Sequence, residues 1–247
     1  MDFVLTSDLD WASEHCIEHF LEVAARFAIK PALFVTHESA AVRRASAEGR
    51  VELGVHPNFL PGSTQGNNVD EVMDHVLHLV PKPIAVRCHR YFWNEQIAAT
   101  FAARGLQLDS NDCAHLKRDL KPIALLNNSL RLPVFFEDDV HWTRGHSWRF
   151  EEFAADFFSA GLKVLNFHPF FVTLNVPDAA FYAQHKSQIQ GLTSGKAARM
   201  RHCGAGAGTF LTDAATAILD RGHRFVALSE LARRAVDDSK IADRRRL

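Results

Sequence analysis

The sequence lacks the features that mark membrane proteins and nucleic-acid-binding proteins. Its formal net charge is −1 over 247 residues, so no global positive field attracts nucleic acid or an anionic membrane. No apolar run approaches the roughly 20 residues of a membrane span. Met1–Leu5 shows no signal-peptide pattern and meets acidic residues at once. We therefore expect a cytoplasmic protein that contacts neither nucleic acid nor the membrane interior.

Cysteine is scarce and scattered. The four cysteines, Cys16, Cys88, Cys113 and Cys203, include no Cys-x-x-Cys pair, so a zinc ribbon or a redox motif is unsupported. Reduced thiols in the cytosol fit this usage. The one run of like charge, Arg244–Arg246, ends the chain, and we expect a flexible tail from about residue 237.

Short apolar runs alternate with helical patterns along the whole chain. Phe3–Leu5 is typical of a strand, and Glu14–Phe27 carries one apolar stripe at helical spacing behind a candidate N-cap, Ser13. Further strands are expected at Ala32–Val35, Val51–Val55, Ile84–Arg87, Leu106–Leu108, Leu130–Phe135, Leu162–Phe167 and Arg224–Ala227. Further helices are expected at Ser39–Glu48, Val69–Val80, Glu95–Arg104, Phe150–Phe158, Thr209–Leu219 and from Ser229.

This alternation predicts parallel β-α-β units in a single domain over residues 1–247. Because the glycine fingerprint of dinucleotide-binding sheets is missing, a closed or distorted barrel is favoured over an open sheet. Pro57–Asn68 and Pro169–Gly208 break the rhythm, and we expect both to be long and largely irregular.

Ionisable side chains follow the expected strands where each strand ends. In a parallel barrel these ends converge on one face, and that face carries the active site. The residues in question are Asp8, Asp10, His56, Arg87, His89, Asp109, Glu137, Asp138, Asp139 and His168. We expect them to surround one cavity.

Four of these positions indicate metal-assisted acid–base chemistry. Asp8 and Asp10 are two residues apart on extended chain and point the same way, so one can bind a metal while the other acts as a base; the alternative is that Asp10 caps the next helix. A histidine beside carboxylates is a common zinc or iron ligand, although His56 could equally be a hydrogen-bonded loop residue. His168, after an apolar strand, suits general acid work.

Taken in order, the motifs resemble the polysaccharide deacetylases with the NodB-homology domain, called carbohydrate esterase family 4. The matching segments are Asp8-Leu9-Asp10, Gly54-Val55-His56, Arg87-Cys88-His89, Asp109-Ser110-Asn111, Leu165–His168 and the closing Arg221–Leu231. Within that family, His56–Ser63 and Glu137–His141 are most similar to the deacetylase-like proteins of lipopolysaccharide O-antigen clusters.

The resemblance implies a distorted (β/α) barrel, an α/β fold with about seven parallel strands. It also implies a metal-dependent hydrolase that removes an N-acyl, typically acetyl, group from a sugar or O-antigen precursor. Asp8 would be the general base, Asp10 and His56 metal ligands, and His168 the general acid. Zinc is the divalent metal that this family leads us to expect.

One position departs from the family pattern. The second metal-binding histidine, four residues after the first, is replaced here by Leu60. A catalytic zinc usually has three protein ligands and a water, so the third must come from elsewhere. His89 is our expected replacement, with Asn58 and the acids Glu137, Asp138 and Asp139 as other candidates. Loss of metal or of activity is the alternative.

The remaining assignments concern the substrate. Arg87 is expected to orient Asp8 or a substrate oxygen, since its guanidinium fits a carboxylate bidentately. Asp109, Glu137, Asp138, Asn58 and Trp142 are expected to contact an N-acylated sugar, and Asp109 could alternatively support Arg87. Gly204–Thr209 could form an anion-binding nest or a flexible lid. The rival functions are hydrolysis of another C–N bond, as in deformylases or cyclic amidases, and carbohydrate binding without catalysis.

Overall fold

The computed structural model describes residues 1–125 and 129–244, and the side chains of these residues up to 236. Its centre is a parallel sheet of six strands in which β1 (Asp2–Asp8) lies between β2 (Ala32–Val35) and β8 (Val164–Asn166). Outside these lie β3 (Glu52–Val55) and β7 (Phe136–Glu137), and β9 (Arg224–Phe225) pairs with the first residues of β1. From Phe3 onward every residue of β1 is buried, as expected for a strand covered on both faces.

A second, smaller sheet closes the barrel. It contains β4 (Leu108–Asp109), β6 (Leu130–Arg131) and β5 (Ile123–Ala124), of which β5 runs antiparallel. Val86 forms parallel bridges to Val55 and to Asp109 and so joins β3 to β4. The chain from β6 then continues to β7, which pairs with β8. The expected α/β class with a distorted barrel is confirmed.

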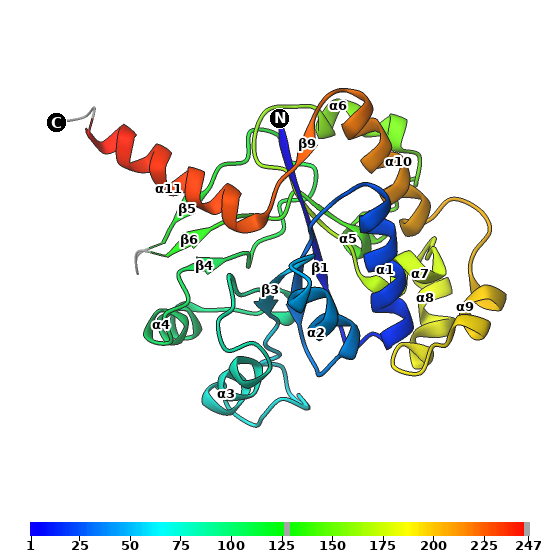
Figure 1. Ribbon diagram of the computed structural model, residues 1–247, viewed down its shortest axis with the longest axis horizontal. Coiled ribbons are helices and arrows are strands. Elements are labelled where there is room, and N and C mark those ends of the chain that lie inside the picture. The colour runs from blue at the N-terminus through cyan, green and yellow to red at the C-terminus, as the bar shows by residue number, and fades with distance from the viewer. Residues whose placement is uncertain (126–128, 245–247) are drawn as a thin grey trace.

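Helices cover the outside of the barrel (Figure 1). They are α1 (Glu14–Arg26), α2 (Ala40–Ala47), α3 (Val69–Leu79), α4 (Glu95–Ala103), α5 (Asp138–Thr143), α6 (Ala154–Phe157), α7 (Pro169–Leu174), α8 (Ala179–His185), α9 (Ser194–Met200), α10 (Ala207–Asp220) and α11 (Leu228–Arg244). Three short 3-10 turns lie at His89–Tyr91, Phe150–Glu152 and Lys186–Gln188. Ser13 caps α1 as expected, because its hydroxyl accepts from the Cys16 amide at 3.3 Å.

Several boundaries differ from the sequence expectations. Ile84–Arg87 contributes only the bridges of Val86, and Leu130–Phe135 divides between β6 and the approach to β7, since one segment must pair with two different neighbours. Phe150–Phe158 splits into a 3-10 turn and α6. The segment from 169 to 208 was expected to be irregular and instead carries α7, α8 and α9. All six residues of α7 are buried, which explains why packing, and not local propensity, decides its conformation.

The glycine-rich segment Gly204–Thr209 also differs from the sequence expectation. Gly206 and Gly208 lie against the backbone of α7, where a Cβ on Gly206 would come within 2.2 Å of the Asn175 carbonyl oxygen. The Thr209 amide donates to Asn175 Oδ1 at 3.0 Å. A packed helix contact therefore replaces the expected nest or lid. Helix α11 continues to Arg244, past the expected start of the tail, and residues 245–247 lie outside the described part of the chain. No described helix is long and apolar enough to cross a membrane.

The core buries one lysine. Lys163 is 1% exposed, its ammonium lies 3.9 Å from the centre of the Phe135 ring, and it donates to Ser159 Oγ at 3.1 Å. Burial disfavours the ammonium and lowers the pKa of Lys163 to about 8. The folded chain therefore holds fewer protons than the unfolded chain between the folded pKa of about 8 and the ordinary value of 10.5. Stability from this residue rises with pH across that window and is lowest below it.

We predict that Lys163→Met raises the free energy of unfolding near neutral pH by about 1–3 kcal/mol, because a side chain of similar length removes a buried charge. The gain should shrink as the pH rises above 8. Urea denaturation of both proteins at several pH values measures this difference, and a gain that stays constant with pH would contradict it.

Candidate active site

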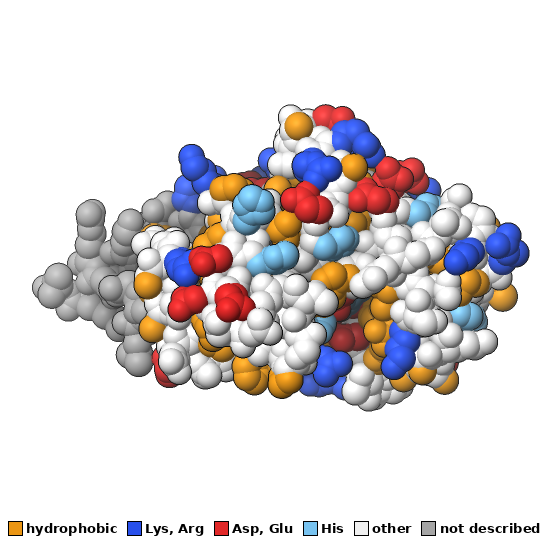
Figure 2. Space-filling model, turned by 90° about the horizontal axis from the view of Figure 1, so that it is seen from below, with side chains coloured by type: hydrophobic (Ala, Val, Ile, Leu, Met, Phe, Trp, Pro, Cys, Tyr) orange, Lys and Arg blue, Asp and Glu red, His pale blue; other side chains and the backbone are white. Residues whose placement is uncertain are grey.

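The carboxyl ends of the barrel strands surround a cavity of about 410 Å³. Figure 2 views this end of the molecule and shows acidic side chains on the floor of a hollow. The cavity is lined by Asp8, Asp10, His56, His89, Arg90, Tyr91, Glu137, Asp139, Val140, Trp142, His168, Phe171 and Tyr182. Groups from separate strand ends thus meet at one place, which is the convergence that a parallel barrel imposes.

Asp10, His56 and His89 form a cluster with the donors of a metal site. Asp10 Oδ1 lies 3.3 Å from His56 Nε2 and 3.1 Å from His89 Nδ1. Two ligands of a tetrahedral zinc, each about 2.0–2.1 Å from the ion, are about 3.3 Å apart. The three ligand atoms all lie within 4.8 Å of one another. The residues present therefore fit a divalent cation, with one carboxylate and two imidazoles.

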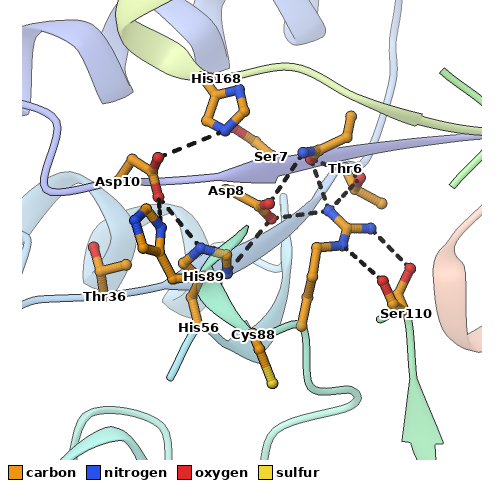
Figure 3. A network of polar contacts seen from close by, with 12 residues as sticks. Thr6, Ser7, Asp8, Asp10, Thr36, His56, Cys88, His89, Ser110 and His168 are labelled. Carbon is orange, nitrogen blue, oxygen red and sulfur yellow. Dashed lines mark hydrogen bonds and ion pairs between the residues drawn. The ribbon is translucent and has the colours of Figure 1, made fainter. Parts of the chain in front are cut away.

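Asp10 contacts His56, His89 and His168 (Figure 3), and its carboxylate keeps its charge. Burial opposes that charge, but hydrogen bonds from His56 and His89 and the nearby charge of His168 outweigh it, and the pKa of Asp10 lies well below its ordinary value. Asp10 is thus ionised over the whole physiological pH range.

Left-handed backbone presents two members of this cluster. Asp10 and Trp11 have φ values of 43° and 56°, and Arg90 and Tyr91, which follow His89, have 55° and 54°. Non-glycine residues adopt this region at a cost, and such residues cluster at functional sites. The Trp11 amide donates to Thr36 Oγ1 at 3.1 Å, which helps to hold the first of the two turns.

Leu60 and Asn58 belong to a different cavity. Both line a pocket of about 470 Å³ formed by the loop before α3. Asn58 Oδ1 accepts from the Leu60 amide at 3.1 Å, and the Asn58 amide donates to Gln65 Oε1 at 2.7 Å. Asn58 is therefore engaged in loop structure beside the metal-type cluster. Neither the ligand role nor the direct substrate contact that we expected of it has support in this geometry.

Asp8 lies beside the cluster and is held by two neighbours. Arg87, which is 0% exposed, donates through Nη1 to Asp8 Oδ1 at 2.9 Å. Asn166 Nδ2 donates to Asp8 Oδ2 at 3.0 Å. The same guanidinium also donates to Ser110 Oγ at 3.0 Å, so the arginine is fixed from several sides. The expected pairing of Arg87 with Asp8 is present in the structure.

His168 forms a dyad with Asp138. Its Nδ1 lies 2.6 Å from Asp138 Oδ1, and its amide donates to Asp138 Oδ2 at 2.8 Å. Burial disfavours the imidazolium, but the charge of Asp138 outweighs burial and raises the pKa of His168 well above its ordinary value. His168 Nε2 faces the cavity, 3.7 Å from Asp10 Oδ2. Asp138 is fully buried, so it supports His168 and does not make the substrate contact that we expected.

The remaining cavity wall is acidic on one side and aromatic on the other. Burial, followed by the charge of Asp139, raises the pKa of Glu137 to about 8. Burial also raises the pKa of Asp139 to about 6. Trp142 packs against Phe171 and Tyr182 with ring centroids 4.8 and 5.3 Å apart. Glu137 and Trp142 therefore stand where a bound ligand would touch them.

Asp109 lies outside this group. It is absent from the residues that line the cavity, and Arg131 binds both of its carboxylate oxygens, at 2.6 and 2.8 Å. Asp109 and Arg131 lie on the adjacent strands β4 and β6, and both are about 95% buried or more. The expected contacts of Asp109 with Arg87 or with substrate are replaced by this structural ion pair.

Sequence reasoning missed Asn166, Tyr91 and Tyr182. Asn166 carried a signal, because it is a polar residue within the apolar run Leu162–Phe167. Tyr91 and Tyr182 are ordinary aromatic residues in the sequence, and only the fold shows that they line the cavity.

A second group of histidines, His115, His141 and His146, also converges. His141 Nε2 lies 2.7 Å from the Ser147 carbonyl oxygen, so it carries the proton, and His141 Nδ1 accepts from His115 Nε2 at 3.2 Å. His115 Nδ1 is then free to accept from the Glu137 amide at 3.3 Å. Burial lowers the pKa of His115 to about 3, so its ring is neutral. This series of hydrogen bonds occupies both ring nitrogens of His115 and of His141 and fixes the backbone of Glu137.

The barrel and its cavity define a deacetylase-type α/β domain with a carboxylate–imidazole centre. Residues 5–186 match the model of the WbmS-like polysaccharide deacetylases, and the chain belongs to that family. The resemblance read from the motifs is therefore confirmed. Among curated proteins, none matches the chain.

Solved structures agree with this assignment. A Bordetella bronchiseptica protein, WbmS, described as a polysaccharide deacetylase involved in O-antigen biosynthesis, is 27% identical, with a TM-score of 0.79 over 87% of this chain and 90% of that chain. A polysaccharide deacetylase from Mycobacterium smegmatis is 15% identical, with a TM-score of 0.59 over 97% and 92% of the two chains. The peptidoglycan N-acetylglucosamine deacetylase Bc1960 is 15% identical, with a TM-score of 0.52 over 93% and 86%. The last two share the fold.

We predict that Asp109→Ala destabilises the protein by about 3–5 kcal/mol, because it leaves the buried guanidinium of Arg131 unpaired. The double variant Asp109→Leu/Arg131→Met should lose much less, since no charge remains buried there. Urea denaturation measures both values. Equal losses in the two variants would show that the ion pair is not the source of the effect.

Proposed function

We propose that the protein is a metal-dependent deacetylase that releases acetate from an N-acetylated sugar of an O-antigen precursor. Family membership supports sugar deacetylation as the general activity. One observation carries the finer proposal: a carboxylate held by arginine and an imidazole held by carboxylate flank a three-residue cluster with metal-type donors. The similarity to WbmS supports the O-antigen precursor as the substrate.

Asp10, His56 and His89 would hold the divalent ion. When bound there, such an ion polarises an amide carbonyl and lowers the pKa of water. Zinc fits the donor set, which contains one carboxylate and two imidazoles. His89 supplies the ligand that Leu60 does not, which favours a catalytic member of the family over a degenerate sugar-binding one.

The chain's own residues carry the protons. Asp8 accepts a proton from the attacking water at a carboxylate oxygen, while Arg87 and Asn166 keep that carboxylate in place. The water oxygen adds to the amide carbon. His168 then donates the proton on Nε2 to the departing nitrogen, the C–N bond breaks, and acetate and a free amino sugar are released. Asp138 holds the imidazolium ready for this donation.

The cysteines fit the proposed location in the cytoplasm. All four are free thiols, and Cys16 and Cys88 are buried. Unpaired cysteines are the normal state in a reducing compartment.

We predict that the purified protein binds one divalent ion per chain and that His89→Ala weakens this binding strongly, because it removes one of the three protein ligands. Cobalt titration followed by visible absorption measures affinity and coordination without any substrate. His75→Ala, on the exposed side of α3, is the matched control and should bind cobalt like the wild type. Full affinity in His89→Ala would remove His89 from the site.

We predict that Asp8→Asn lowers turnover of N-acetylated sugar substrates by about 10²- to 10⁴-fold, the usual contribution of a general base. Its cobalt affinity should stay close to that of the wild type, since Asp8 is not a member of the ligand cluster. Acetate release under saturating metal measures the first quantity. An Asp8→Asn variant with wild-type turnover would exclude Asp8 as the base.

A further inference from the structure

The turn that carries His89 needs support that the metal-type cluster itself does not supply. His56 ends β3, whereas His89 lies in a separate 3-10 turn, so the two imidazoles come from different segments. Arg90 and Tyr91 continue the turn in left-handed conformation. Such backbone persists only where surrounding contacts hold it. The His89 amide donates to the Pro57 carbonyl oxygen at 2.9 Å, but this bond fixes only the start of the turn.

The far end of the turn is tied to the opposite side of the cavity. The Tyr91 hydroxyl donates to Glu137 Oε2, although the two residues are 46 positions apart. Glu137 is 3% exposed and is the second residue of β7, which pairs with β8. The barrel therefore fixes its position. Burial raises the pKa of Tyr91 well above its ordinary value, which keeps the donated proton on the phenol.

Glu137 also connects this turn to the base. Asn166 Nδ2 donates to Glu137 Oε1 at 3.2 Å and to Asp8 Oδ2 at 3.0 Å. Arg87 Nη1 donates to Asn166 Oδ1 at 2.7 Å and so fixes the orientation of that amide. A continuous set of hydrogen bonds therefore runs from the His89 turn through Tyr91, Glu137 and Asn166 to Asp8.

We propose that the Tyr91–Glu137 hydrogen bond is a latch that holds the His89 turn in the position where His89 ligates the metal. Tyr91 and Glu137 are positioning residues in this proposal, which rests on the metal site proposed above. Two histidines on one loop would be held in place by the same loop. His89 comes from a different segment than His56, so it needs contacts of its own, and the latch supplies them. Supporting groups of this kind typically contribute a factor of 10–100 to metal affinity.

Tyr91→Phe tests the latch directly, because it removes the hydroxyl and keeps the ring. We expect the affinity for zinc to fall about 10- to 100-fold, measured by competition with a chromogenic chelator at constant pH. Tyr182→Phe is the matched control: it removes another hydroxyl from the same cavity wall and should leave zinc affinity unchanged. Thermal unfolding of the metal-free variants shows whether either substitution affects the fold itself.

A pair of substitutions at Glu137 provides a second test. Glu137→Gln keeps an oxygen that can accept from Tyr91 and should bind zinc much as the wild type does. Glu137→Leu removes the acceptor and should reproduce the loss seen in Tyr91→Phe. Zinc affinity in Tyr91→Phe equal to that of the wild type, or equal losses in the Gln and Leu variants, would overturn the latch.

The outcomes also separate the latch from the proposed function. If the wild type binds zinc and His89→Ala does not, the metal site stands, and a silent Tyr91→Phe then rejects the latch alone. If the wild type itself binds no divalent ion, the proposed function and the latch fall together.

Discussion

The buried guanidinium of Arg87 is the constraint on which the rest of the site depends. A charge that is fully removed from water is tolerated only with an ionised partner and satisfied hydrogen bonds. Asp8 supplies the opposite charge, and Thr6, Ser110 and Asn166 accept further hydrogen bonds from the guanidinium. The same interaction therefore holds the proposed base in place and stabilises the centre of the barrel.

The cavity assigns opposite behaviour to carboxyl groups that lie close together. Asp10 faces imidazoles, and its pKa is held low despite burial, whereas Glu137 faces Asp139 and Asp8, and its pKa rises to about 8. A site in which every carboxylate were ionised would repel itself. Separating the groups into an ionised Asp10 and a mostly neutral Glu137 lets several acids occupy one small space. The environment of each carboxyl group, and not its residue type, determines its protonation state.

The sequence was informative where a role depends on chain position and uninformative where it depends on a distant partner. Asp8, Asp10, His56 and His168 could be placed at one site because parallel strands end on one face. Asp109 follows the same rule, yet Arg131 on the neighbouring strand binds it, and no local pattern announces that pairing. Asn166 and Tyr91 could not be assigned from the sequence, because their contacts are with Glu137, which lies 29 and 46 positions away in the chain. Helix α7 escaped prediction because packing against α1 and α10 stabilises it.

The replacement of a metal-binding histidine by Leu60 shows what a motif does and does not specify. The chemistry of a divalent ion requires donor atoms about 3.3 Å apart around one point, and it sets no condition on their order in the chain. In this protein the loop after His56 turns Leu60 and Asn58 toward a separate pocket, while the turn after Val86 brings His89 to Asp10. Placing the second imidazole of the cluster on another segment separates two tasks that a single loop would combine. The loop after His56 lines a pocket that has no ionisable lining residue. The turn at His89 carries the metal-type donor together with the left-handed backbone that presents it.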